Sequence, residues 1–304
     1  MMIIFFVLMF SLCIGSFLNV CIYRIPRQKS IVFPPSLCPR CNKSIKWFDN
    51  IPLISYILLR GRCRFCKERI SAQYFIVELL TGVLLLLLYF KFGISIKFFI
   101  YALLFAVFIV VSFIDIEWML IPDFFSLFGI AFGLLVSFLY PPLMNSASNL
   151  EAFLRSLGGA LFGGLSLTCV AFFGWFIFKK EAMGGGDIKL IAMIGAFIGW
   201  QYTLMTLFIS FLAGAFFGVS FLIIVAIERV VTTLKRIKRR SSGLTKRQLY
   251  FTVPAKSLIH QLNRRRGTAI PFGPYIVLGA ILSILYGDKL LNIYPIILQK
   301  IWGM

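Results

Sequence analysis

Long apolar runs alternate with shorter polar stretches along almost the whole chain. A helix needs about 20 mainly apolar residues to cross the hydrocarbon core of a bilayer. Eight segments reach or nearly reach that length: 2–22, 72–90, 96–115, 122–140, 152–178, 187–200, 201–227 and 272–288. The sixth is short and only just long enough to span. The pattern predicts an all-α polytopic membrane protein with about eight transmembrane helices.

The first apolar run, 1–20, lacks the parts of a removable signal peptide. No Lys or Arg precedes its apolar stretch, and no small-residue cleavage site follows it. We therefore expect a retained first transmembrane helix.

Composition supports membrane insertion, because 60% of the 304 residues are hydrophobic and only 14% are charged. The net charge of +20 comes from loops: the segment 23–71 holds eleven Lys and Arg, 228–271 holds twelve, and 179–189 holds three. By the positive-inside rule these three segments are cytoplasmic, which places the N-terminus outside. The alternation of sides then holds through all eight predicted spans.

The basic loops also bear on partners. Most Lys and Arg residues cluster in these loops rather than being spread over a folded face, which argues against nucleic-acid binding. Attraction to anionic lipid, at about 1 kcal/mol per basic residue near the surface, explains them better. The predicted organisation is a first transmembrane helix (1–22), a cytoplasmic module (23–71), spans two to seven (72–227), a basic cytoplasmic loop (228–271), and a last span with a tail (272–304).

Seven cysteines fall into two groups. Three lie in or beside predicted spans, where they suit packing: Cys13, Cys21 and Cys169. The other four form two C-x2-C pairs separated by 21 residues: Cys38 with Cys41, and Cys63 with Cys66. Four thiolates so arranged suit a tetrahedral zinc ion, although the separation is one residue longer than the usual window.

A reducing cytoplasm disfavours structural disulfides in the segment that holds these pairs. Structural zinc is therefore the interpretation that we favour, because a segment of about 45 residues has little core of its own. Redox-active dithiols and thiols that bind no metal stay open as alternatives.

Two carboxylates, Asp115 and Asp187, lie at matching depth near the cytoplasmic ends of predicted spans. An aspartate at a helix centre in the bilayer costs about 2.5–3.5 kcal/mol on insertion scales, so its presence indicates a task. Paired carboxylates hydrolyse peptides when one is ionised and the other is protonated, and close approach produces that division. The pair predicts an intramembrane aspartyl protease.

Helix dipoles suggest how the two groups divide the work. Asp187 opens a predicted helix, where the positive end favours a carboxylate, whereas Asp115 closes one. Our hypothesis is that Asp187 is the general base and Asp115 the general acid. Before Asp187, the residues Gly184, Gly185 and Gly186 lack Cβ atoms and predict a loop with unusual dihedrals that approaches an extended substrate closely.

Other acidic residues near the same side have simpler explanations. Glu78 is expected to form interhelical hydrogen bonds, with a role as a third catalytic acid open as the alternative. Asp123 is expected to cap the fourth span rather than to take part in catalysis. His260 lies in a basic loop without metal-binding partners.

Two rival classes stay open at this point. An ion-coupled transporter would place polar residues along its spans near the midplane, but these spans are nearly bare of them. A non-enzymatic zinc-ribbon scaffold accounts for the cysteines and leaves both aspartates without a role.

Several motifs, in order over nearly the whole chain, resemble the type IV prepilin peptidases, also called leader peptidase/N-methyltransferases. Besides the cysteine pairs, they are GSFLNV at 15–20, YRIP at 23–26, NIPLISY at 50–56, the stretch 115–123 that ends in IPD, GGGDIKL at 184–190 and IPFGPY at 270–275. The resemblance implies an inner-membrane aspartyl protease of the Gly-x-Gly-Asp type, with Asp115 and Asp187 at the positions of its catalytic pair.

The resemblance also implies the substrates, which are prepilins or the pseudopilins of type II secretion. These precursors carry a short basic leader before an apolar helix and are cut after a glycine at that junction. Members of the family often methylate the new N-terminus with S-adenosylmethionine. No residue here marks that cofactor's site from the sequence alone; the segment 23–71, with Asn19 and Arg24 at its membrane root, is the expected region.

Overall fold

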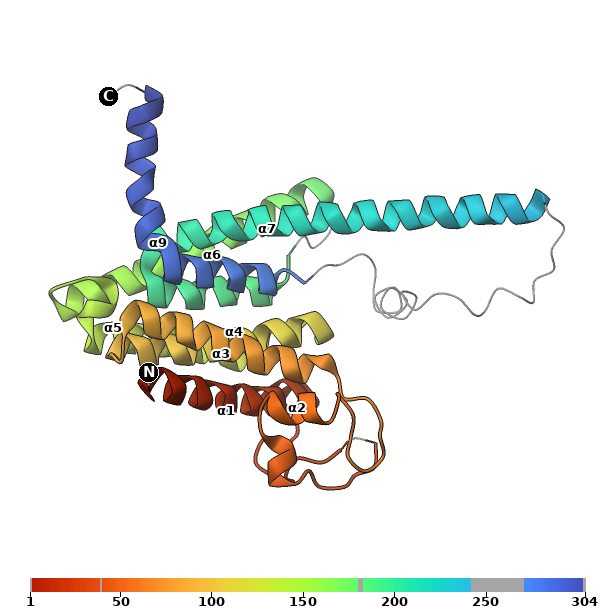
Figure 1. The fold of residues 1–304 in the computed structure, drawn as a ribbon. Helices are drawn as coiled ribbons and strands as arrows, with labels where there is room; N and C mark the ends of the chain where they lie inside the picture. The colour runs from red at the N-terminus through yellow and green to blue at the C-terminus, as the bar shows by residue number, and fades with distance from the viewer. Residues whose placement is uncertain (1, 39, 180–182, 242–270, 303–304) are drawn as a thin grey trace.

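The structure is a computed structural model that describes residues 2–38, 40–179, 183–241 and 271–302 (Figure 1). It is built from helices, with no extended strand in those ranges. The long helices are α1 (Met2–Arg24), α3 (Ala72–Phe92), α4 (Ile96–Trp118), α5 (Asp123–Leu139), α6 (Asn149–Phe178), α7 (Gly185–Ser241) and α9 (Gly273–Trp302). The short ones are η1 (Ile25–Arg27), η2 (Trp47–Asn50), α2 (Ile54–Leu58) and η3 (Pro141–Met144). The predicted all-α membrane fold is confirmed.

The number of spans is not confirmed at eight. Within the described residues, five helices are long and apolar enough to cross a membrane, and α5, with 17 residues, is a shorter apolar helix. Two predicted spans, 187–200 and 201–227, lie within α7, which is interrupted at Gly199 (φ 73°, ψ 172°). Glycine suits that left-handed conformation because it has no Cβ. The chain therefore forms two helical segments there, as the apolar pattern predicts.

The predicted basic loop 228–271 is wrong in its first part, since α7 continues through it to Ser241. The remainder, 242–270, lies outside the described residues, and so does the expectation for His260.

Glycines allow α6 and α7 to pack with their backbones in contact. A Cβ on Gly163 would lie 2.8 Å from the carbonyl oxygen of Ile191, and one on Gly195 would overlap the backbone of Gly159. Small residues spaced four apart, as in Gly159 and Gly163, are typical of close helix pairs in membranes.

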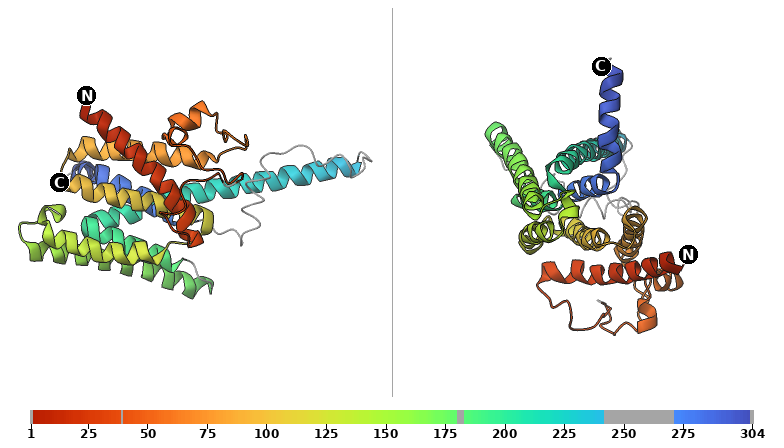
Figure 2. Two further views of the ribbon diagram at one scale, coloured as in Figure 1. Left: turned by 90° about the horizontal axis from the view of Figure 1, so that it is seen from below. Right: turned by 90° about the vertical axis from the view of Figure 1, so that its left-hand side faces the viewer.

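Several segments that are far apart in the sequence meet at one end of the helix bundle (Figures 1 and 2). That end holds the module between α1 and α3, the α4–α5 turn, and the starts of α7 and α9. Among the five candidate spans, α4 is the one most enclosed by its neighbours. Its buried side chains include Phe105, Phe108 and Ile114. At the other end, Lys91 of α3 makes a 2.7 Å ion pair with Asp288 of α9. The predicted site residues therefore come from helix ends that meet on one side of a fixed bundle.

Candidate active site and metal centre

Asp115 lies in the last turn of α4 and is only 6% exposed. The helix ends at Met119, whose left-handed backbone (φ 52°) lets its N–H donate to the carbonyl oxygen of Asp115 over 2.8 Å. The Asp115 side chain receives a second contact from far along the chain: the N–H of Gly273, the first residue of α9, donates to its Oδ2 over 3.0 Å. The carboxyl group is thus held between the end of one helix and the start of another.

Asp187 lies in the first turn of α7 and is 9% exposed. Its backbone N–H donates to the carbonyl oxygen of Gly184 over 3.1 Å, which starts the helix. Asp187 and Asp115 are both buried, and the helix starts that border them, at Gly186 and Gly273, pack against the same residue, Ile121. The structure therefore brings the two predicted site residues into one region from separate helices.

Ile121, in the α4–α5 turn, packs against both helix starts. A Cβ on Gly186 would lie 2.9 Å from the Cβ of Ile121, and a Cβ on Gly273 would lie 3.4 Å from its Cδ1. Because glycine occupies both positions, α7 and α9 approach the turn closely. This close packing keeps bulk solvent away from the two aspartates.

The helix dipoles are more balanced than the sequence indicates. The N-terminus of α9 faces Asp115 through Gly273, and Asp187 lies at the N-terminus of α7. Both carboxyl groups are consequently near the positive end of a helix. The prediction that Asp187 is the general base and Asp115 the general acid considered only the helix that carries each residue and omitted α9. In the structure, helix dipoles therefore do not distinguish the two carboxyl groups.

The glycine segment differs from the predicted loop. Gly185 and Gly186 already belong to α7, and among the described residues positive φ values at glycine occur only at 61, 93 and 199. The expectation of unusual dihedrals at 184–186 is therefore wrong for this conformation. Gly184 and Gly185 are exposed, and a Cβ on Gly185 would have no neighbour within 4 Å among the residues that the structure describes.

Asp123 does not cap α5 as predicted. Pro122 is the N-cap residue, and Asp123 instead makes a 2.7 Å ion pair with Lys189 in the first turns of α7. This pair joins the start of α5 to the helix that carries Asp187.

Glu78 is confirmed as a hydrogen-bonding group, with an unexpected main partner. Its Oε2 accepts the backbone N–H of Leu53, in the module, over 2.8 Å. On the other side α1 packs directly against it, since a Cβ on Gly15 would lie 2.8 Å from the Cα of Glu78. It is buried on α3. Glu78 therefore connects the module to the first two membrane helices.

The four module cysteines meet in space. The sulfur atoms of Cys38, Cys41, Cys63 and Cys66 all lie within 4.8 Å of one another, with 3.8 Å between those of Cys38 and Cys66. Such a set can surround a single tetrahedral ion, because each thiolate supplies one ligand at about 2.3 Å.

The two C-x2-C turns have the same backbone geometry. The N–H of Cys38 donates to Lys43 and the carbonyl of Cys38 accepts from Asn42; Cys63 makes the matching pair with Glu68 and Lys67. An isolated antiparallel bridge flanks each turn, Leu37 with Ser44 and Arg62 with Arg69. This repeated turn geometry presents four sulfurs to one point, as a structural zinc site requires.

Local dipoles also prepare the thiols for a metal. The backbone N–H groups of Cys66 and Phe65 point at the Cys63 sulfur and lower the pKa of that thiol to about 7. At Cys66 the N–H of Glu68 also lowers the pKa of the thiol. Desolvation and the three neighbouring thiols outweigh that effect and raise the pKa of Cys66 to about 11. A divalent cation would relieve this crowding by binding all four as thiolates.

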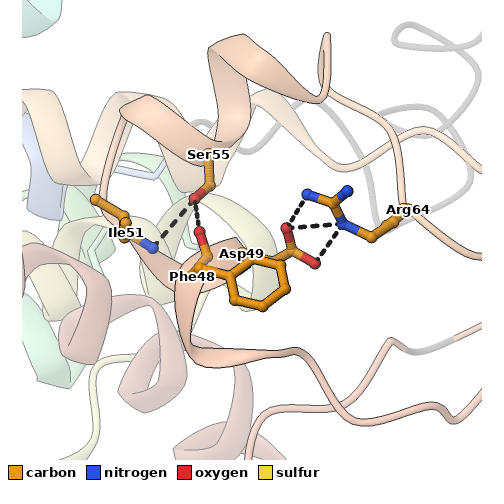
Figure 3. Close-up of polar contacts among 5 residues, drawn as sticks. All are labelled: Phe48, Asp49, Ile51, Ser55 and Arg64. Carbon is orange, nitrogen blue, oxygen red and sulfur yellow. Dashed lines mark hydrogen bonds and ion pairs between the residues drawn. The ribbon is translucent and has the colours of Figure 1, made fainter.

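A second polar cluster fixes the middle of the module (Figure 3). The hydroxyl of Ser55 donates to the carbonyl oxygen of Phe48 over 2.8 Å and accepts the N–H of Ile51 over 3.2 Å. The Arg64 guanidinium pairs with Asp49 at 2.6 Å and holds the pKa of that carboxyl below its usual range. These contacts join η2 and α2 to the second cysteine turn.

Two residues in these networks were not predicted as site residues. Gly273 is in the IPFGPY motif, which was a signal for its importance, but its contact with Asp115 joins positions 158 apart. Leu53 is in NIPLISY, yet no local pattern indicates that its N–H meets Glu78.

Two family models match the chain. Residues 9–92 match the bacterial Peptidase A24 N-terminal domain, and residues 102–219 match the type IV leader peptidase family. No solved structure matches significantly.

Curated relatives match over nearly the full chain. A prepilin leader peptidase/N-methyltransferase of Myxococcus xanthus is 33% identical over 95% of this chain and 92% of that protein. Proteins with the same name from Pseudomonas putida (30% identical; 92% and 89% covered) and Legionella pneumophila (32%; 94% and 92%) are also similar.

Proposed function

Since this chain belongs to the type IV leader peptidase family, we propose that it is an intramembrane aspartyl endopeptidase whose catalytic pair is Asp115 and Asp187. Its substrates are prepilins or type II secretion pseudopilins, cut after the glycine that precedes their apolar helix. The observation that carries the assignment is that two buried carboxyl groups, from the last turn of α4 and the first turn of α7, lie at helix ends that pack around the same residue, Ile121.

The chemistry follows from a pair that shares one proton. The ionised carboxylate takes a proton from water, whose oxygen attacks the scissile carbonyl carbon. The protonated partner donates to the carbonyl oxygen. As the tetrahedral intermediate collapses, the first carboxyl group gives the proton that it took from water to the leaving nitrogen, and the hydroxyl that becomes the new carbonyl returns its proton to the partner. The pair acts as a unit, so we assign the two roles to the pair rather than to individual residues.

Access to the pair fits a substrate that arrives from the side that holds the module. Gly184 and Gly185 are exposed beside Asp187 and leave room for an extended segment. The apolar helices and the relatives support a multi-pass protein of the bacterial inner membrane. We propose that the module end faces the cytoplasm and that the N-terminus lies outside, because the segment 23–71, which forms the module, holds eleven Lys and Arg.

Zinc, in this proposal, is structural. Four cysteine thiolates complete a tetrahedral shell and leave no open position for a substrate, so the ion's contribution is to hold the module's fold.

We also propose that the protein methylates the new N-terminus with S-adenosylmethionine, because the relatives are named N-methyltransferases. Arg24 lies in the region that we expected to bind this cofactor, but its guanidinium group makes structural hydrogen bonds. It donates to the carbonyl oxygens of Ser30 and Pro34. Asn19 donates to the carbonyl oxygen of Tyr74 over 3.1 Å. Neither side chain is assigned to the cofactor.

The test is cleavage of a purified prepilin by the purified protein in lipid. Asp115→Asn and Asp187→Asn should each lower the rate by about 1,000-fold or more, since general acid and base catalysis contribute about 10²–10⁴ each. Asp123→Asn is the matched control, because an exposed ion pair contributes under about 1 kcal/mol. Cleavage that survives either Asn variant at more than a tenth of the wild-type rate would refute the assignment.

A further inference from the structure

A pocket of about 340 Å³ opens in the module between the end of α2 and the second cysteine turn. Its lining residues are Leu59, Arg60, Arg62, Cys63 and Lys67. It is separate from the aspartate pair, which lies among the membrane helices. Three of its five lining residues are cationic, and no carboxylate lines it.

The three cations lack partners in the part of the chain that the structure describes. Other basic residues of the module are paired there: Arg64 with Asp49 at 2.6 Å, and Arg40 with Glu68 at 4.0 Å. The side chains of Arg60, Arg62 and Lys67 are exposed and make no ion pair with a described residue. Guanidinium groups gathered at one pocket match the geometry of phosphate oxygens.

The backbone beneath the pocket is fixed. Arg60 and Gly61 both have left-handed conformations (φ 52° and 63°), and the Gly61 N–H donates to the carbonyl oxygen of Tyr56 over 2.8 Å. The N–H of Arg62 donates to Leu59 over 3.1 Å. Because this turn is closed by hydrogen bonds, the cations project from a preorganised frame, which lowers the entropic cost of binding.

An apolar stripe adjoins the pocket. Ile54, Ile57 and Leu58 of α2 lie on one helix face, and Ile57 and Leu58 are 62% and 76% exposed. The module is tied at both ends to membrane helices, α1 and α3, which holds it near the lipid surface. Apolar side chains beside a basic site are the composition of an interfacial lipid contact.

We propose that this pocket binds the phosphate of an anionic phospholipid headgroup, while Ile57 and Leu58 enter the headgroup–acyl boundary. The charge of the pocket disfavours two other ligands of this enzyme class. S-adenosylmethionine carries a net positive charge at neutral pH and a prepilin leader is basic, and the three cations outweigh the double negative charge that a zinc ion on four thiolates, Cys63 among them, would place beside the pocket. The inference does not depend on peptide cleavage.

The experiment titrates full-length, zinc-loaded protein in a neutral detergent and measures binding by calorimetry. The ligands are soluble short-chain phosphatidylglycerol, the matching phosphatidylcholine, and inorganic phosphate. We expect phosphatidylglycerol to bind at least about tenfold more tightly than the other two, since charge and apolar contact both contribute. Equal binding of inorganic phosphate would overturn the assignment to a lipid, and equal binding of phosphatidylcholine would overturn the role of charge.

Two sets of variants locate the site. The triple variant with Arg60→Gln, Arg62→Gln and Lys67→Gln should weaken phosphatidylglycerol binding by about tenfold or more. The control triple variant removes the same charge from the module outside the pocket and should weaken binding by less than about threefold. It combines Lys29→Gln, Lys43→Gln and Lys46→Gln. Equal losses would show attraction to net charge alone and refute the pocket.

The stripe is tested separately from the cysteine turns. Ile57→Ser with Leu58→Ser should weaken phosphatidylglycerol binding by about tenfold and leave inorganic phosphate binding unchanged. Unchanged phosphatidylglycerol binding by this variant would refute the proposal. Metal analysis would show whether the charge variants lose their zinc, and this test remains valid even if they do.

Discussion

The backbone N–H of Gly273 donates a hydrogen bond to Oδ2 of Asp115 over 3.0 Å, which makes the start of α9 part of the aspartate site. A side chain at 273 is incompatible with this contact, because a Cβ there would lie 2.6 Å from the same oxygen. The start of α9 is therefore required to hold a carboxyl group that belongs to α4.

Gly273→Ala should lower prepilin cleavage by about 100-fold, because it displaces the Asp115 carboxyl group by a fraction of an ångström or more. Cleavage rate and zinc content would be measured together, and zinc should stay unchanged. Gly164→Ala is the control, since its Cβ would meet the Ala192 Cβ at an ordinary 3.5 Å. A Gly273→Ala rate within about threefold of wild type would contradict a tight fit at Asp115.

The sequence predicts the helices well because apolar length is a local property. The break at Gly199 falls one residue before the predicted boundary between two spans. The helix from 228 to 241 was missed because its charge density resembles a loop, although Lys and Arg are good helix formers.

The candidate site is predictable to the extent that its motifs are local. The C-x2-C spacing is enough to predict four converging thiols. By contrast, the bonds from Gly273 to Asp115 and from Leu53 to Glu78 join distant positions, and only packing brings these residues together. The dipole argument failed for the same reason, since α9 approaches Asp115 only in the folded chain.

The protein should contain one zinc ion per chain, lost on replacing any cluster cysteine. Cys38→Ser leaves three thiolates for a site that needs four ligands, so zinc content should fall to less than about a fifth. Metal analysis of purified protein measures this directly. Cys169→Ser, an exposed cysteine of α6 outside the cluster, should keep full zinc content.

Removal of the metal should release the module rather than the membrane bundle. A chelator should speed proteolysis between 23 and 71, because the described residues that follow α1 in this segment form only the short helices η1, η2 and α2. Full resistance to proteases after zinc loss would show that the polar contacts around Ser55 hold the module without metal.

Glu78→Ala should loosen the module while zinc stays bound. The substitution leaves the partly buried N–H of Leu53 without its acceptor, which costs about 1 kcal/mol and at most about 3 kcal/mol. Limited proteolysis of the module should become faster by at least about fivefold. Glu78→Gln keeps an oxygen acceptor, so it should stay near wild type in both proteolysis and prepilin cleavage. Loss of cleavage in the Gln variant with an intact module would instead identify Glu78 as an acid of the catalytic machinery.

Neighbouring glycines of α6 provide a test of backbone packing. Gly159 touches the backbone of Gly195, whereas a Cβ on Gly158 would have no neighbour within 4 Å. Gly159→Ala should therefore destabilise the bundle by about 1–3 kcal/mol through overpacking, seen as a lower melting temperature in detergent. Gly158→Ala changes the same atoms one position away and should leave the melting temperature unchanged or raise it slightly, because alanine favours the helix. Equal melting temperatures for the two variants would mean that α6 and α7 are not in backbone contact, and the position of Asp187 would then need another anchor.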